Sequence, residues 1–169
     1  MDPLDRTDIH ILELLQRDGR LSHVELAERV GLSPTPCTRR VRRLEKLGII
    51  RGYAALVEPK RVGQNVLAFV QIKLERHPDD VVERFRRTLD ERPEVVSAHA
   101  MAGEMDFLLQ VVVTDLDALG RFTLHQLLKM PGVRDIRSSL VLETLKAVSR
   151  VPLEAATGKI FGGASDPLL

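Results

Sequence analysis

The feature that most limits the fold is a pair of short helical patterns, over residues 22–30 and 34–47, separated by one tight turn. Ser22 begins the first pattern and Glu25 follows three residues later, which is the spacing of a capping box. Gly31 then suits the left-handed conformation in which many helices end. The sequence therefore predicts a helix-turn-helix, a motif that places its second helix in the major groove of DNA.

The apolar residues of both patterns recur at helical spacing. In the first pattern they are Val24, Leu26, Ala27 and Val30, and in the second they are Cys37, Val41, Leu44 and Gly48. Ser33 can cap the second helix, with Pro34 at its first position, where a missing N–H costs nothing. Residues 33–44 include no acidic residue. The second helix therefore has one face for a core and one basic face for an anionic partner.

Base-contacting side chains gather near the N-terminal end of a recognition helix, where arginine can bind guanine or pair with phosphate. We expect base contacts from Ser33, Thr35, Pro36, Thr38 and Arg39. We expect phosphate contacts from Arg42, Arg43 and Lys46. An isolated basic run is more often a solvated helix face, but the capped turn before this run favours nucleic-acid binding.

The flanking segments complete a three-helix domain with a wing. Asp5 can cap a helix over residues 5–17, and Asp8 stands three residues later. Residues 49–56 alternate in polarity, which predicts a short hairpin after the recognition helix. Arg51 in this wing can touch the phosphate backbone beside the groove.

Composition sets outer limits on function. The chain has 169 residues, enough for two small domains, and its 44% hydrophobic content excludes a wholly disordered protein. Lysine and arginine number 25 against 24 acidic residues, so only the clustering of basic residues indicates DNA binding. The single cysteine, Cys37, is expected in the core. No apolar run has membrane-spanning length and no signal peptide is evident, so we expect a soluble, cytoplasmic protein.

A second domain follows a Pro- and Gly-containing boundary. Strands are predicted over 66–74, 95–102, 106–114 and 133–145, and helices over 78–89 and 115–129. The order is that of a ferredoxin-like βαββαβ domain, which makes the whole chain α+β. The expected division is a DNA-binding domain over 1–58, a linker over 59–65, the second domain over 66–148 and a loosely ordered tail over 149–169.

Two helices can cover only one face of such a sheet, which leaves the other face open. We expect Phe69, Val111 and Val113 on that open face. Apolar residues there favour dimerisation through the sheet. The fold alone does not define the function, because many activities use it.

Four segments together resemble the leucine-responsive regulator and AsnC (Lrp/AsnC) family of transcription factors, and its leucine-responsive branch in particular. They are residues 4–20, 25–56, 103–109 (GEMDFLL) and 127–142. The resemblance implies a winged helix-turn-helix joined to an effector-binding RAM domain. It further implies dimers that assemble into octamers of four dimers, and an amino acid or related metabolite that binds between dimers and alters assembly or affinity for double-stranded DNA. No cofactor is implied.

In the family a G-x-x-D loop between the second and third RAM strands lines the effector pocket. The matching residues here are Gly103, Glu104, Met105 and Asp106. Glycine permits close backbone approach, and either acidic residue can pair with an α-ammonium group. The facing wall is expected from Arg137, Ser138 and Ser139. The alternative is a tight turn in which the glycine and the aspartate serve geometry alone.

The leading hypothesis is therefore a sequence-specific regulator controlled by an amino acid. An architectural DNA-binding protein with little effector control is the alternative, and it predicts broad affinity with steep salt dependence. An amino-acid-handling enzyme on the second domain is a third hypothesis. The sequence offers no nucleophile–base pair, no phosphate-binding glycine loop and no histidines at metal-ligand spacing, so we expect neither an enzyme nor a metal site.

Overall fold

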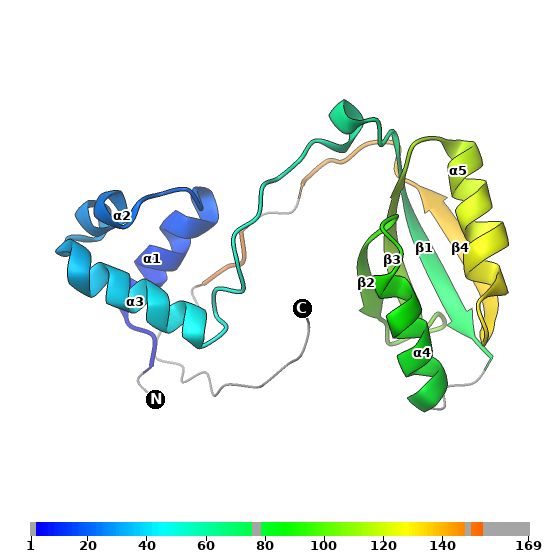
Figure 1. The fold of residues 1–169 in the computed structure, drawn as a ribbon, viewed down its shortest axis with the longest axis horizontal. Coiled ribbons are helices and arrows are strands. Elements are labelled where there is room, and N and C mark those ends of the chain that lie inside the picture. Colours follow the sequence, from blue (N-terminus) through cyan, green and yellow to red (C-terminus); the bar gives the residue numbers. More distant parts are fainter. Residues whose placement is uncertain (1–2, 76–78, 148–149, 154–169) are drawn as a thin grey trace. The chain divides into compact units, whose positions relative to one another are not determined.

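The computed structural model describes residues 3–75, 79–147 and 150–153. The chain forms two compact units (Figure 1). The first consists of the described residues up to Leu56 together with those from Lys146 onward, and the second runs from Val57 to Leu145. Each unit has its own hydrophobic core.

The first unit contains three helices whose ends agree with the sequence patterns. They are α1 (Arg6–Arg17), α2 (His23–Val30) and α3 (Pro34–Lys46). Both predicted capping boxes form, with Asp5 and Asp8 at α1 and Ser22 and Glu25 at α2. Gly31 ends α2 in the left-handed conformation, with φ of 69°. Ser33 precedes α3 but makes no side-chain capping bond, so that expectation was wrong.

Helices α1, α2 and α3 pack around one core. It is formed by Leu4, Ile11, Leu12, Leu21, Leu26, Ala27, Cys37, Val41 and Leu44. Cys37 is fully buried, as predicted, and burial raises the pKa of its thiol. Val24 was wrongly placed on the buried side of α2 and is 54% exposed. Leu26 is a side chain of α2 that enters the core. Val24 is exposed because it stands two positions earlier, and residues two apart lie on nearly opposite sides of a helix.

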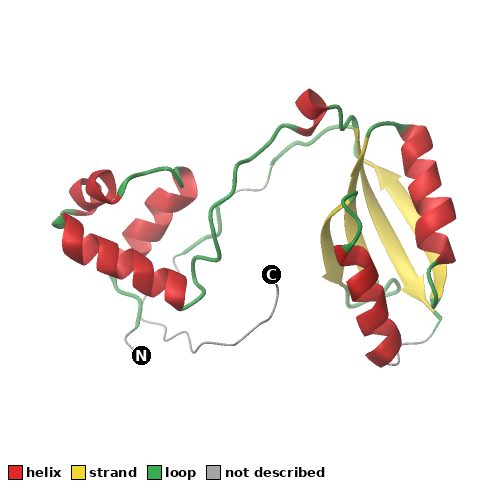
Figure 2. Cartoon of the chain, viewed as in Figure 1, coloured by secondary structure: helices red, strands yellow, loops and turns green. Residues whose placement is uncertain are grey.

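The predicted wing hairpin does not form. Residues 51–58 have no strand partner and are exposed, and Figure 2 shows them as loop. An isolated two-stranded hairpin is marginal in water without a surface to pack on. The alternating pattern over residues 49–56 was therefore a weak predictor of pairing.

The second unit has the predicted βαββαβ order. Its elements are β1 (Val66–Leu74), α4 (Asp79–Asp90), β2 (Val95–Ala100), β3 (Phe107–Val113), α5 (Leu116–Gly120) and β4 (Val133–Leu140). The strands lie in the order β2-β3-β1-β4, and every neighbouring pair is antiparallel. A short 3₁₀ turn, Pro59–Val62, precedes β1.

Two elements of this unit differ from the prediction by more than two residues or in their regularity. Helix α5 continues as a π-helical segment, Arg121–Gln126, and a 3₁₀ turn, Leu127–Lys129, so the predicted single helix is irregular. Strand β4 ends at Leu140 and not at residue 145. Its pairing stops because its neighbour β1 begins at Val66, and the last bond runs from Val141 N to Leu67 O.

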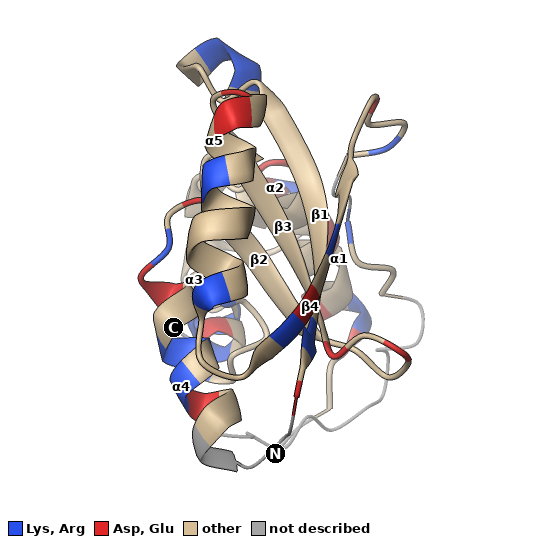
Figure 3. Cartoon of the chain, turned by 90° about the vertical axis from the view of Figure 1, so that its right-hand side faces the viewer, with Lys and Arg blue, Asp and Glu red and all other residues tan. Residues whose placement is uncertain are grey.

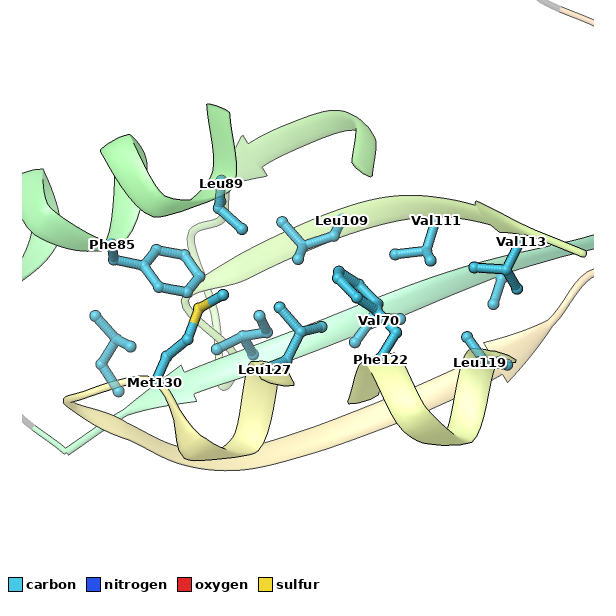
Figure 4. Close-up of a cluster of buried hydrophobic side chains, with 13 residues drawn as sticks. Val70, Phe85, Leu89, Leu109, Val111, Val113, Leu119, Phe122, Leu127 and Met130 are labelled. Carbon is cyan, nitrogen blue, oxygen red and sulfur yellow. The ribbon is translucent and has the colours of Figure 1, made fainter. Parts of the chain in front are cut away.

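The core of the second unit lies between the helices and one face of the sheet (Figure 4). Phe122 and Leu127 pack there against Val70 and its neighbours on β3. Val111 and Val113 belong to this core, so placing them on the open face was wrong. Because side chains alternate along a strand, a shift of one residue exchanges the faces.

The open face of the sheet still carries apolar side chains. Phe69 is 38% exposed there, as predicted, and it pairs with Gln110 on β3 and Ser139 on β4. Strands β1, β2 and β3 are almost free of charged residues, which Figure 3 shows in tan. The face that the helices do not cover is therefore mostly neutral over β1, β2 and β3, whereas Lys73, Asp135 and Arg137 bring charge to it beside and along β4.

Candidate functional site

The outer face of α3 carries a hollow of about 350 Å³. It is lined by Pro34, Thr35, Thr38, Arg39 and Arg42. Four of these are residues predicted to contact DNA, and both arginines are exposed. The arrangement offers hydroxyl groups and guanidinium groups on one helix face, the chemistry that reads base edges and phosphates.

The remaining predicted DNA contacts lie near this hollow in sequence but do not line it. Ser33, Lys46 and Arg51 are exposed, and Pro36 is half-buried in the first turn of α3. Arg43 points elsewhere, because its Nη1 donates to Asp8 Oδ2 on α1 at 3.0 Å. Its side chain is thus already paired within the domain, which the helical pattern alone did not indicate.

Thr38 has a partner that sequence reasoning missed. Its Oγ1 lies 3.1 Å from Nδ1 of His23, the first residue of α2. The bond joins the two helices of the motif beside the hollow. The only available signal was the position of His23 directly after the helix cap, where it can face the next helix.

A second hollow, of about 200 Å³, lies beside the loop between β2 and β3. It is lined by Gln71, Met101, Ala102, Gly103, Glu104, Met105, Phe107 and Arg137. Four predicted effector residues are thus brought together, three from the loop and one from β4. Glu104 Oε1 accepts a hydrogen bond from Arg137 Nη2 at 2.9 Å, and Lys73 Nζ donates to the carbonyl oxygen of Glu104 at 2.6 Å.

Gly103 leaves the backbone of this loop accessible. Its φ is 154°, and a Cβ built there would meet no atom within 4 Å. A ligand can therefore approach the main chain closely at this point. Met101 and Phe107 add apolar surface to a hollow whose opposite charges are carried by Glu104 and Arg137.

The other predicted effector residues lie outside the hollow. Asp106 instead accepts a hydrogen bond from the Leu74 backbone N–H at 2.7 Å, so its carboxylate holds the loop to β1. Ser139 pairs with Phe69 and Ser138 with Val70 across the β1–β4 ladder, and neither lines the hollow. Gln71 of β1 lines the hollow because it stands opposite Arg137 of β4 in the sheet. The sequence did not reveal this register of the two strands.

Neither a metal centre nor a membrane-spanning helix is present in the described part of the chain. Within residues 3–75, 79–147 and 150–153, no group of three or more His, Cys, Asp or Glu side chains is placed to hold a metal ion. In the same residues, no helix combines the length and the apolar character needed to cross a membrane.

Comparisons with known proteins identify both units. Residues 4–51 match the family model described as winged helix-turn-helix DNA-binding, and residues 67–151 match the Lrp/AsnC ligand binding domain. The leucine-responsive regulatory protein of Escherichia coli (strain K12) is 44% identical over 151 residues, which cover 89% of this chain and 92% of that protein.

Solved structures agree over the same length. A transcriptional regulator from Neisseria meningitidis in complex with L-Met has 46% identity and a TM-score of 0.85, with 90% of this chain and 98% of that chain covered. An AsnC family regulator from Agrobacterium tumefaciens has 39% identity and a TM-score of 0.83, with 90% and 99% covered. The first unit is thus a DNA-binding domain and the second an amino-acid-binding domain, and the relatives are regulators and not enzymes. The chain belongs to the Lrp/AsnC family of transcriptional regulators, as its four sequence segments predicted.

Proposed function

We propose that this regulator reads DNA with the hollow on α3. The observation that carries the proposal is that Thr35, Thr38, Arg39 and Arg42 share one exposed surface next to the N-terminal end of the helix. Arg39 lies closer to that end and is assigned to base edges, and Arg42 to phosphate. The proposed place of action is the cytoplasm, as expected for a DNA-binding regulator whose relatives are bacterial.

The salt dependence of binding tests this assignment. We would measure affinity for the promoter of the protein's own gene, and for a scrambled duplex, over a range of salt concentrations. Arg42→Ala should weaken binding to both duplexes and lower the log–log salt slope by about 0.9. Arg39→Ala should cost about 1–3 kcal/mol on the specific duplex and reduce discrimination.

Arg87→Ala is the matched control, because Arg87 is an exposed arginine on α4 in the other unit. It should leave affinity and salt slope unchanged. Unaltered binding in both α3 variants would overturn the groove assignment. Equal affinity for the two duplexes in the unmodified protein would instead favour an architectural DNA-binding role.

We propose that the effector is an amino acid with an apolar side chain, bound in the hollow at Gly103, and that no cofactor is needed. Glu104 can face the α-ammonium group, and Arg137 the α-carboxylate. Met101 and Met105 supply flexible apolar walls. A relative named as leucine-responsive and a structure that contains L-Met support this choice of side chain.

Titration calorimetry with leucine, methionine, aspartate and lysine tests the effector. Leucine or methionine should bind, and the charged amino acids should not. Glu104→Gln and Arg137→Met should each weaken binding at least about tenfold, since each removes a charged hydrogen-bond partner. Arg134→Met, an exposed arginine on the same strand, is the control and should bind normally. Equal binding by all four proteins would place the effector elsewhere.

We further propose that the open sheet face pairs two copies of the chain, and that four such dimers form an octamer. The exposed Phe69, which lies between the neutral residues Gln110 and Ser139 on the neighbouring strands, supports the dimer. Phe69→Lys should produce monomers in analytical ultracentrifugation while the secondary structure remains intact. Val62→Lys, which changes an exposed valine outside the sheet, should leave the assembly unaltered. An unaltered mass in Phe69→Lys would exclude this face.

A further inference from the structure

Two arginines of α3 converge on one buried carboxylate of α1. Asp8 is 0% exposed, and its Oδ1 accepts from Arg40 Nη1 at 2.8 Å while its Oδ2 accepts from Arg43 Nη1 at 3.0 Å. Arg40 Nη1 also donates to Asp5 Oδ2 at 2.7 Å. The side chains of Arg40 and Arg43 are only 31% and 30% exposed. We call the four residues Asp5, Asp8, Arg40 and Arg43 the Asp8 anchor.

The two aspartates of the Asp8 anchor also form the N-terminal cap of α1. Asp8 N donates to Asp5 Oδ1 at 2.8 Å, and Asp5 N donates back to Asp8 Oδ2 at 3.3 Å. A buried carboxylate is tolerated only when its oxygen atoms are paired. Although burial opposes ionisation of Arg40, hydrogen bonds to Asp8 and Asp5 raise the pKa of that side chain. Two carboxylates and two guanidinium groups leave the anchor with no net charge.

The basic residues of α3 therefore fall into two sets. Arg39 and Arg42 line the outer hollow, whereas Arg40 and Arg43, each one position later, reach back to α1. One residue corresponds to a rotation of about 100° around a helix, so the two sets lie on different sides. The inward pair contributes no net positive charge to the DNA-facing surface.

We propose that Asp8 is a positioning residue for DNA recognition: it fixes the rotation of α3 through Arg40 and Arg43 and withholds their charge from DNA. This proposal rests on the DNA-reading role of the α3 hollow. A fixed rotation aims Thr35 and Arg39 at the same base edges in every complex. Non-specific binding depends on charge and not on this aim.

Two arginine variants on one helix test the charge assignment. The probes are a duplex selected from a random pool for tight binding and a scrambled duplex of equal length. Arg43→Gln should leave the salt slope on both probes unchanged. Arg42→Gln, the matched variant one position earlier, should lower it by about 0.9. A fall of similar size in Arg43→Gln would show that Arg43 contacts phosphate and would overturn the proposal.

Asp8→Asn tests the positioning role. It should reduce affinity for the selected duplex by about tenfold or more, while affinity for the scrambled duplex stays the same or rises because the loss of one carboxylate gives the anchor a net positive charge. The ratio of the two affinities is the readout that a purely structural role would not change. An equal loss on both duplexes would overturn the proposal.

Circular dichroism and thermal unfolding would establish that Asp8→Asn retains its helices. If it unfolds, Arg40→Gln replaces it, because Asp8 then keeps Arg43 and the same fall in the affinity ratio is expected. An unaltered affinity ratio in Arg40→Gln would overturn the proposal. An unaltered salt slope in Arg42→Gln would instead overturn the groove assignment on which it rests, so the two failures are distinguishable.

Discussion

Tyr53 donates its phenol hydrogen to Oε1 of Glu45 at 3.1 Å. Glu45 lies in the last turn of α3, and Tyr53 lies in the segment that leaves the domain. The tyrosine ring also approaches Gly19, where a Cβ would stand 3.4 Å from Cδ1 of the ring. A single side chain thus connects the outgoing segment to α3 and to the turn between α1 and α2.

The titration of Tyr53 is the first prediction. Partial desolvation of the phenol, followed by the hydrogen bond to Glu45 and its negative charge, raises the pKa of Tyr53 to about 12. The chain has one tyrosine and no tryptophan, so ultraviolet absorbance follows this phenol alone. Glu45→Gln should move the pKa toward the ordinary value of about 10.

The sign of the linked stability follows from the raised pKa. The folded state favours the neutral phenol, so its stabilisation is complete below about pH 10 and is lost as the pH rises through about 12. Denaturant unfolding at several alkaline pH values would measure that loss. A tyrosine pKa near 10 in the unmodified protein would contradict both expectations.

Local chemistry made much of the first unit predictable. The reciprocal caps at Asp5 and Asp8 and at Ser22 and Glu25 depend only on residues three apart, and Gly31 needs only its own φ. The order of strands and helices in the second unit was likewise visible as a change of periodicity. These features arise from neighbours in sequence, and sequence therefore predicts them.

Features that depend on distant partners were not predictable. Arg43 was assigned to phosphate, but in the structure it pairs with Asp8. Asp8 lies 35 residues away on another helix, so the helical pattern around Arg43 could not reveal this pairing. Asp106 was assigned to a ligand because its bond to Leu74 depends on how two distant strands meet. The faces of Val111 and Val113 depend on strand register, which an apolar run does not define.

The second prediction concerns the described residues after β4. Gln16 on α1 accepts a hydrogen bond from Val151 N at 2.6 Å and donates to Val151 O at 3.2 Å. Leu153 packs against the core of the first unit. The loose tail expected from residue 149 is therefore wrong for residues 150–153, and residues 154–169 lie outside the described part of the chain.

Removing this attachment should destabilise the first unit. Gln16→Ala should cost about 1–2 kcal/mol, because two hydrogen bonds are lost at a solvent-accessible position. Glu13→Ala, an exposed position on the same helix, should change stability by less than about 0.5 kcal/mol. Urea unfolding followed by circular dichroism compares the two. Equal midpoints would show that residues 150–153 do not support the helices.

The third prediction compares two glycines of the second unit. Gly132 has φ of 87°, and a Cβ there would stand 2.7 Å from Cγ1 of Val81. Gly120 lies in helical conformation, with φ of −60°, and a Cβ there would meet no atom within 4 Å. Gly132→Ala should destabilise by about 1–3 kcal/mol, whereas Gly120→Ala should be neutral or stabilise by up to about 1 kcal/mol. Thermal unfolding measures the stability of both variants. A Gly132→Ala protein as stable as the parent would contradict the backbone strain and the steric clash expected at this position.

The last prediction separates structure from effector binding in the loop between β2 and β3. Asp106 accepts from the Leu74 N–H next to the irregularity of the β1–β4 ladder, whereas Glu104 faces the hollow and pairs with Arg137. Asp106→Ala leaves a partly buried N–H without this acceptor, which should cost about 1–3 kcal/mol of stability. Glu104→Gln replaces an exposed carboxylate and should change stability by less than about 0.5 kcal/mol.

Effector binding should show the opposite order. Below its unfolding temperature, Asp106→Ala should bind leucine or methionine within about threefold of the parent, a difference under 1 kcal/mol. Glu104→Gln should lose that binding, because the α-ammonium group loses its carboxylate. Calorimetric titration and thermal unfolding of the same two proteins decide the matter. An Asp106→Ala protein that is as stable as the parent but does not bind would contradict the structural assignment of Asp106 and would favour a contact with the ligand.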